Sequence, residues 1–172
     1  MMEASSRSFA SSSAEETRAI ARALGRGLLG GDTIALSGDL GSGKTTFTRG
    51  LVEGLGLDAR IVSSPTYVLE HIYPTRVPVH HFDAYRLSSV EELLALGFHE
   101  RLDGRRVVVV EWAEKVLPAF PPDRLLVEIE GPGAGDPSEY RKLVFSSAPG
   151  VWASRLDALS LYTPKVLARP ER

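Results

Sequence analysis

Short apolar or alternating runs recur along the chain, separated by stretches in which apolar residues return every three to four positions. The first pattern is typical of strands and the second of helices. The runs predict strands over residues 32–36, 67–73, 77–83, 107–112, 124–130 and 140–146. The helical spacing predicts helices over residues 45–55, 90–96 and 149–159, preceded by one that begins at Ser12 or Ser13 and ends before Gly30. An α/β protein is therefore expected.

Short connections and one run of valines define the expected sheet. The strands over residues 67–73 and 77–83 are joined by a proline turn, and those over 124–130 and 140–146 by a glycine-rich loop. Such connections are typical of antiparallel hairpins. The four valines of residues 107–110 instead suit a central parallel strand that is buried on both faces. The predicted sheet is thus mixed, parallel plus antiparallel, and flanked by helices.

The length of 172 residues suits one domain. We expect this domain to span residues 12–159. The serine-rich residues 1–11 are predicted to be a disordered tail, and residues 160–172 to be a second tail.

The most specific local feature is the sequence SGDLGSGKTT, in which Gly38 to Thr45 match the pattern G-x-x-x-x-G-K-[ST] at every fixed position. A strand is expected before it and a helix after it, as a phosphate-binding P-loop requires. Glycines let main-chain N–H groups converge on phosphates, and the helix directs the positive end of its dipole at the anion. The motif predicts a nucleoside triphosphate site in a single P-loop NTPase domain. The alternative is a glycine-rich turn that matches by chance.

The motif also assigns residues to ATP and Mg²⁺. Lys44 is expected to neutralise the outer phosphates, and the Thr45 hydroxyl to be a magnesium ligand. The other residues assigned to the nucleotide are Asp39, Leu40, Gly41, Ser42, Gly43 and Thr46. The chain contains no Asn or Gln, which excludes an Asn-Lys-x-Asp guanine-binding motif and favours adenine.

Two acidic residues stand at the ends of predicted strands, where a P-loop ATPase needs a carboxylate for Mg²⁺. Glu111 follows the four valines and is the first candidate, and Asp83 is the second. Both are also candidate catalytic residues, together with Lys44. The alternatives are a surface charge at Glu111 and a turn cap at Asp83. Thr66, in a polar Ser-Pro-Thr segment, is a candidate switch that senses the γ-phosphate.

Several ring side chains stand near the candidate acids in the sequence. His81 shares a strand face with Asp83, so it either positions water or packs through a hydrogen bond. His80 faces the other way and is expected to be structural. Tyr85 and Trp112 are expected to pack, although Trp112 directly follows a site acid.

The net charge and the cysteine content indicate which partners the protein binds directly and in which compartment it acts. The formal net charge is −2, whereas a surface that coats nucleic acid is clearly basic, so RNA is expected to be reached through a partner. The absence of cysteine excludes disulfides and thiolate metal sites and fits a reducing cytoplasm. No run approaches the roughly eighteen apolar residues of a membrane span. A cytoplasmic protein without membrane contact is expected.

Five segments of the chain carry a family pattern. They are GDLGSGKTTFTRG at 38–50, SPTYVLEHIY at 64–73, HFDAYRL at 81–87, ELLALGFHE at 92–100 and VVEWAEK at 109–115. In this order they resemble TsaE, formerly YjeE, the bacterial ATPase family of tRNA threonylcarbamoyladenosine synthesis. The resemblance covers residues 12–145, and its HxDxYR and VEW elements are more specific than the P-loop.

The resemblance implies a compact P-loop domain that hydrolyses ATP while bound to the TsaB and TsaD subunits. TsaD, rather than this chain, would transfer the threonylcarbamoyl group to the adenosine beside the anticodon. The resemblance also places Thr17 in the region that closes over the adenine side of the nucleotide. Family members usually carry a Gly-Arg pair where this chain has Tyr140 and Arg141. Arg141 is assigned to the nucleotide on that basis.

Two other functions fit the same motif. A small-molecule P-loop kinase would use an acid such as Asp83 to activate a substrate hydroxyl, but its lid arginines have no clear counterpart among the scattered arginines of this chain. A nucleotide-gated scaffold would bind nucleotide with negligible turnover. Substrate-dependent ADP release would indicate the kinase, and partner-dependent ATP hydrolysis would indicate the TsaE-like function.

Overall fold

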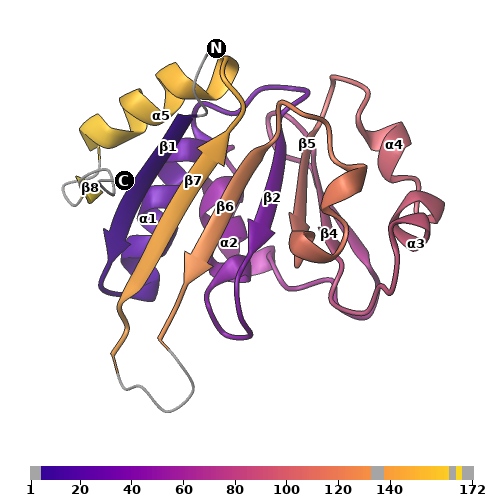
Figure 1. Ribbon diagram of the computed structural model, residues 1–172, viewed down its shortest axis with the longest axis horizontal. Helices are drawn as coiled ribbons and strands as arrows, with labels where there is room; N and C mark the ends of the chain where they lie inside the picture. Colours follow the sequence, from indigo (N-terminus) through magenta and orange to yellow (C-terminus); the bar gives the residue numbers. More distant parts are fainter. Residues whose placement is uncertain (1–4, 133–137, 163–165, 168–172) are drawn as a thin grey trace.

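The computed structural model describes residues 5–132, 138–162 and 166–167. The described strands form one sheet in the order β3-β4-β5-β2-β6-β7-β1-β8 (Figure 1). The strands are β1 (Ser5–Ser11), β2 (Thr33–Ser37), β3 (Glu70–Tyr73), β4 (Val79–Asp83), β5 (Val107–Glu111), β6 (Leu125–Glu130), β7 (Arg141–Ser147) and β8 (Val166–Leu167). The neighbours β4, β5, β2 and β6 run parallel, and the outer pairs are antiparallel. The predicted α/β fold with a mixed sheet is confirmed.

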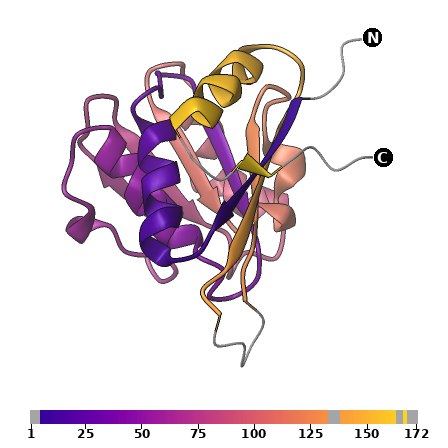
Figure 2. The ribbon, with the colours of Figure 1, turned by 90° about the vertical axis from the view of Figure 1, so that its left-hand side faces the viewer.

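Helices cover both faces of the sheet. The helices are α1 (Ala14–Gly25), α2 (Lys44–Gly54), α3 (Val90–Ala95), α4 (Phe98–Arg101) and α5 (Val151–Tyr162), with short 3-10 turns at Ala59–Ile61, Ala113–Lys115 and Leu117–Ala119. Side chains of α1, α2 and α5 join one buried cluster, and those of α3 and α4 join a second. In Figure 2 the indigo helix α1 stands to one side of the edge-on strands β1 and β7. The molecule is therefore a three-layer α/β domain.

The valine run of β5 contributes to both clusters. Val107 and Val109 belong to the cluster under α1 and α2, whereas Val108 and Val110 belong to the cluster under α3 and α4. All four side chains are at most 1% exposed. Alternate side chains of a strand point to opposite faces, so a strand covered on both sides needs an unbroken apolar run. The predicted central position of this strand is confirmed.

The expected disordered tail at residues 1–11 differs from the structure, because residues 5–11 form β1. This strand pairs with β7 along its whole length, from Ser5 opposite Ser147 to Ser11 opposite Arg141. Phe9 is fully buried and meets Phe145 edge-on, with ring centroids 5.1 Å apart. Serine has no strand preference of its own, so main-chain pairing with a long neighbour forms this strand. Residues 1–4 lie outside the described part.

The expected tail over residues 160–172 also differs in part. Helix α5 continues to Tyr162, and β8 pairs with β1 opposite Ser8 and Phe9. Two residues of pairing leave little pattern in a sequence, so this element was not predicted. Residues 163–165 and 168–172 lie outside the described part of the chain.

The first hairpin is shorter than predicted, because its first strand begins at Glu70 rather than at residue 67. Leu69 adopts φ +69°, which lies outside the strand region, and its N–H bonds the Pro65 carbonyl oxygen at 2.6 Å. The residues before Glu70 therefore turn away from the sheet. Their loop, residues 63–69, passes the carboxyl ends of the parallel strands and contributes to the site.

Helices α1 and α2 cross at close range through three glycines. A Cβ on Gly25, Gly50 or Gly54 would lie under 3.0 Å from a main-chain oxygen of the facing helix. Larger side chains would therefore push the helices apart. This crossing holds the P-loop helix α2 against α1.

Candidate functional site

The P-loop is held in the shape that its glycines permit. Gly38 has φ +144° and Gly43 has φ +114°, both in the left-handed region that favours glycine. Gly43 caps α2 without a side-chain hydrogen bond, so the first main-chain N–H groups of the helix have no cap from that residue. The predicted strand, loop and helix order around the motif is confirmed, with α2 beginning one residue earlier, at Lys44.

Lys44 is folded back onto the loop. Its ammonium donates to the carbonyl oxygens of Gly38 at 2.6 Å and Asp39 at 2.8 Å, and lies 3.7 Å from the ring centroid of Trp112. Burial lowers the pKa of Lys44, an effect that the carboxylates of Glu111 and other nearby acids oppose. A buried ammonium that lines the cavity beside carbonyl oxygens can exchange these partners for phosphate oxygens.

The two candidate acids meet at adjacent strand ends. Asp83 of β4 is directly opposite Glu111 of β5 in the parallel register, and Leu36 of β2 is opposite Glu111 on the other side. Strand β2 continues into the P-loop two residues later. The carboxyl ends of parallel strands at such a point are where open α/β sheets bind ligands. The structure therefore brings Lys44, Asp83 and Glu111 to the same edge.

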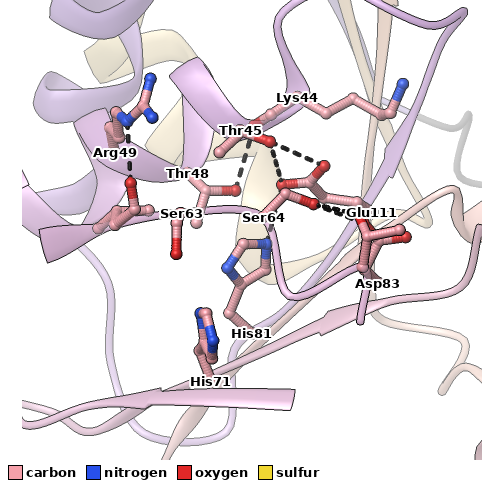
Figure 3. A network of polar contacts seen from close by, with 12 residues as sticks. Lys44, Thr45, Thr48, Arg49, Ser63, Ser64, His71, His81, Asp83 and Glu111 are labelled. Carbon is pink, nitrogen blue, oxygen red and sulfur yellow. Dashed lines mark hydrogen bonds and ion pairs between the residues drawn. The ribbon is translucent and has the colours of Figure 1, made fainter. Parts of the chain in front are cut away.

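Glu111 is buried and receives two donors. It is 3% exposed, and the Thr45 hydroxyl donates to its two oxygens at 2.9 and 3.1 Å. Nε2 of His81 lies 2.9 Å from Oε1 of Glu111, so this ring nitrogen donates to the carboxylate. Figure 3 shows Thr45 and His81 converging on Glu111. The alternative of a surface charge at the end of β5 does not hold.

Asp83 is equally buried and binds the loop over residues 63–69. Its Oδ2 accepts hydrogen bonds from the hydroxyls of Ser64 and Thr66, both at 2.7 Å. Its Oδ1 accepts from the main-chain N–H of Tyr85 at 2.8 Å, so the predicted turn-cap role is present as well. Thr66 thus lies against a site acid.

A cavity of about 400 Å³ opens over these residues. It is lined by Leu40, Gly41, Gly43, Lys44, Thr45, Thr46, Ser64, Thr66, Asp83, Tyr85, Glu111 and Trp112. Asp39 and Ser42, which the motif assigned to the nucleotide, are not among the lining residues. A second cavity, of about 330 Å³, lies between α1 and α5 beside Trp152 and contains none of the predicted site residues.

Three lining residues were not assigned to the site from the sequence: Ser64, Tyr85 and Trp112. The rings of Tyr85 and Trp112 pack together with centroids 5.0 Å apart. Trp112 has φ +58°, an unusual conformation for a large residue, and it places the indole over Lys44. The sequence signals were the position of Trp112 directly after a site acid and of Ser64 two residues before Thr66.

Thr17 and Arg141 lie behind the P-loop. The Thr17 hydroxyl is buried and bonds Ser11 Oγ at 2.8 Å and the Ser13 carbonyl oxygen at 3.2 Å. Nε of Arg141 donates to the Ser42 carbonyl oxygen at 3.0 Å. A Cβ on Gly43 would lie 3.3 Å from Arg141 Nε and 4.0 Å from the Thr17 methyl group. Arg141 therefore supports the loop and Thr17 lies near it, and contact of either residue with a nucleotide stays a prediction.

The oxygen donors fit Mg²⁺ better than a softer metal. The available ligands are the hydroxyl of Thr45 and the carboxylates of Glu111 and Asp83, which are hard donors. Within the described residues, no group of three or more His, Cys, Asp or Glu side chains could hold a metal ion. A magnesium ion with one or two carboxylates and bound phosphates does not need such a group.

Comparison with known proteins gives the family. The model of the family described as "Threonylcarbamoyl adenosine biosynthesis protein TsaE" matches residues 11–138. The chain belongs to the TsaE family. The TsaE protein of Bacillus subtilis is 40% identical over 147 residues, covering 85% of this chain and 89% of that protein. The TsaE protein of Streptomyces coelicolor is 38% identical over 141 residues, with 80% and 94% covered.

A solved structure supports the same family. The crystal structure of Bacillus subtilis YdiB superposes with a TM-score of 0.75 and 29% identity, covering 94% of this chain and 99% of that chain. Lys44, Thr45, Asp83 and Glu111 lie inside the range matched by the TsaE model, whereas Arg141 lies just beyond it. Among the helices that the structure describes, none is long and apolar enough to cross a membrane.

Proposed function

We propose that this protein is the ATP-binding and ATP-hydrolysing subunit of tRNA threonylcarbamoyladenosine biosynthesis, the process named in its relatives. One observation carries the proposal: Lys44 and Thr45, at the start of α2, share a cavity with Asp83 and Glu111 at the ends of β4 and β5. This is the set of groups that P-loop ATPases use for phosphates, Mg²⁺ and the attacking water.

Each residue has a defined task in this proposal. Lys44 exchanges the carbonyl oxygens of Gly38 and Asp39 for phosphate oxygens, and the N–H groups at the start of α2 bind the same anion. Thr45 and Glu111 would hold Mg²⁺, and the charge that this ion would neutralise is that of the transferred phosphoryl group. Asp83 lines the same cavity and would act near the phosphates once its carboxylate gives up Ser64 and Thr66. Either Asp83 or Glu111 orients the attacking water.

The proposed partners are TsaD and TsaB, with tRNA reached through their complex and the reaction taking place in the cytoplasm. The chain is slightly acidic, with a formal net charge of −2, which supports indirect rather than direct contact with tRNA. ATP hydrolysis would drive or reset the transferase. Such a signal would begin at Asp83, which accepts hydrogen bonds from Ser64 and Thr66 of the loop over residues 63–69.

The test is ATP hydrolysis by the purified protein alone and with the TsaB–TsaD pair, measured as phosphate release. Strong stimulation by the pair, lost in Asp83→Ala, is the expected result. Normal ATP binding without stimulated hydrolysis would replace this proposal with the nucleotide-gated scaffold. ADP release that depends on an added small hydroxyl compound, with no response to the pair, would instead indicate the kinase.

A further inference from the structure

A chain of buried hydrogen bonds leads from Glu111 away from the cavity. His81 lies between Glu111 and Tyr73: its Nε2 is 2.9 Å from Glu111 Oε1, and its Nδ1 is 3.3 Å from the Tyr73 hydroxyl. The Tyr73 hydroxyl also lies 3.2 Å from the Ser63 carbonyl oxygen and 3.3 Å from Nδ1 of His71. His81 is fully buried and Tyr73 is 4% exposed. Neither residue lines the cavity.

The hydrogen bonds of His81 and Tyr73 control the orientation of the Glu111 carboxylate. Thr45 lies within hydrogen-bond distance of both carboxylate oxygens, whereas His81 contacts Oε1 alone. The bond from His81 therefore selects one rotation of the carboxylate, and among the described residues Oε2 has a hydrogen bond from Thr45 alone. Tyr73 in turn orients the imidazole, since it bonds the opposite ring nitrogen. Partners of this kind behind a metal ligand typically raise metal affinity.

The same series of hydrogen bonds reaches the loop that binds Asp83. The Tyr73 hydroxyl lies beside the carbonyl oxygen of Ser63, and the next residue, Ser64, donates to Asp83. The start of the loop over residues 63–69 is thus joined to Glu111 through Tyr73 and His81, and to Asp83 directly. Figure 3 shows Ser64 directed at Asp83 and His81 directed at Glu111.

We infer that His81 and Tyr73 are positioning residues: they orient Glu111 for the divalent metal and link its orientation to the loop that binds Asp83. This inference rests on the proposed function, because it takes Glu111 to be a metal ligand. His80 is the matched comparison, since it is the adjacent buried histidine but binds Glu70 on the opposite face of β4, at 2.6 Å.

The experiment uses electron paramagnetic resonance to measure the affinity for Mn²⁺ of the protein bound to a non-hydrolysable ATP analogue. The affinity for the analogue without metal is measured in parallel. His81→Phe should weaken Mn²⁺ binding about tenfold while metal-free analogue affinity changes less than about twofold. His81→Gln, which keeps an N–H donor at a similar position, should recover most of the loss. His80→Phe should leave Mn²⁺ affinity unchanged. Tyr73→Phe, which removes only the hydroxyl, should weaken it about threefold.

Mn²⁺ affinity within twofold of wild type in folded His81→Phe would overturn the inference. If that variant does not fold, Tyr73→Phe decides, because it keeps the aromatic ring: unchanged Mn²⁺ affinity overturns the inference, and a loss supports it. Failure of the proposed function looks different, since the wild-type protein itself would then bind no metal–nucleotide complex.

Discussion

Replacing Thr45 by valine removes one hydroxyl and keeps the branched shape of the side chain. In the structure that hydroxyl donates to Glu111, which is 3% exposed, at 2.9 and 3.1 Å. A hydroxyl has one proton, so the two distances represent one charge-assisted hydrogen bond. Its loss should lower the free energy of unfolding by about 1.5–2 kcal/mol. The loss is limited because His81 still donates to the carboxylate and water can reach the partly exposed position 45.

This cost corresponds to a fall of about 3–8 °C in the melting temperature for a protein of this size. Thr48→Val is the matched control, because it makes the same chemical change one turn further along α2. The Thr48 hydroxyl donates only to the Lys44 carbonyl oxygen, at 3.1 Å, so its loss should cost less than about 1 kcal/mol. Thr45→Ser keeps the hydroxyl and should resemble the wild type.

The decisive assay is nucleotide affinity measured by calorimetry with Mg²⁺ and with a chelator. We expect Mg²⁺ to strengthen binding at least about tenfold in the wild type and in Thr48→Val, and less than about twofold in Thr45→Val. The reason is that valine offers no oxygen to the metal beside Glu111. An unchanged Mg²⁺ effect in a folded Thr45→Val protein would refute the assignment of this hydroxyl as a metal ligand.

Three other outcomes are expected. Glu111→Ala and Asp83→Ala should keep most metal-free nucleotide binding by calorimetry but lose phosphate release at least about a hundredfold, and wild-type turnover in both would contradict their assignment. Gly50→Ala should lower the free energy of unfolding by about 1–3 kcal/mol in chemical denaturation, because its Cβ would meet the Arg18 carbonyl oxygen. Alanine favours helices over glycine, so an increase in stability would contradict the close crossing of α1 and α2. Burial raises the pKa of Tyr73 to about 12, from 10.0 for an exposed tyrosine. The folded protein therefore favours the neutral phenol, and its stability should fall as pH rises from about 10 to 12. Tyr73→Phe should flatten that fall in unfolding experiments across this pH range, and parallel curves would count against the burial effect.

Local patterns predicted the elements that carry their own signal. The P-loop is contiguous, so all its fixed positions could be recognised from Gly38 to Thr45. Strand β5 was recognisable because burial on both faces requires consecutive apolar residues. The N-terminal cap of α1 was recognisable too, since Ser13 and Glu16 are three residues apart and the Ser13 hydroxyl accepts from the Glu16 N–H at 3.1 Å.

The edge strands had no comparable signal. Residues 5–11 contain one large apolar side chain, Phe9, and otherwise mostly serine. Their strand depends on hydrogen bonds to β7, more than a hundred residues later in the chain. Main-chain donors and acceptors are the same in every residue except proline, so pairing of this kind does not show in the side-chain pattern.

The sequence by itself determined which chemical groups this protein brings to a nucleotide: a P-loop lysine and threonine, and acids at strand ends. Only the tertiary structure decided which of those groups meet. The parallel register places Asp83 beside Glu111, the loop over residues 63–69 binds Asp83, and His81 rather than His80 contacts Glu111. These contacts join residues from 17 to 30 positions apart. A pattern along the chain marks where a strand ends, but the strand order and register of the folded sheet decide which ends become neighbours.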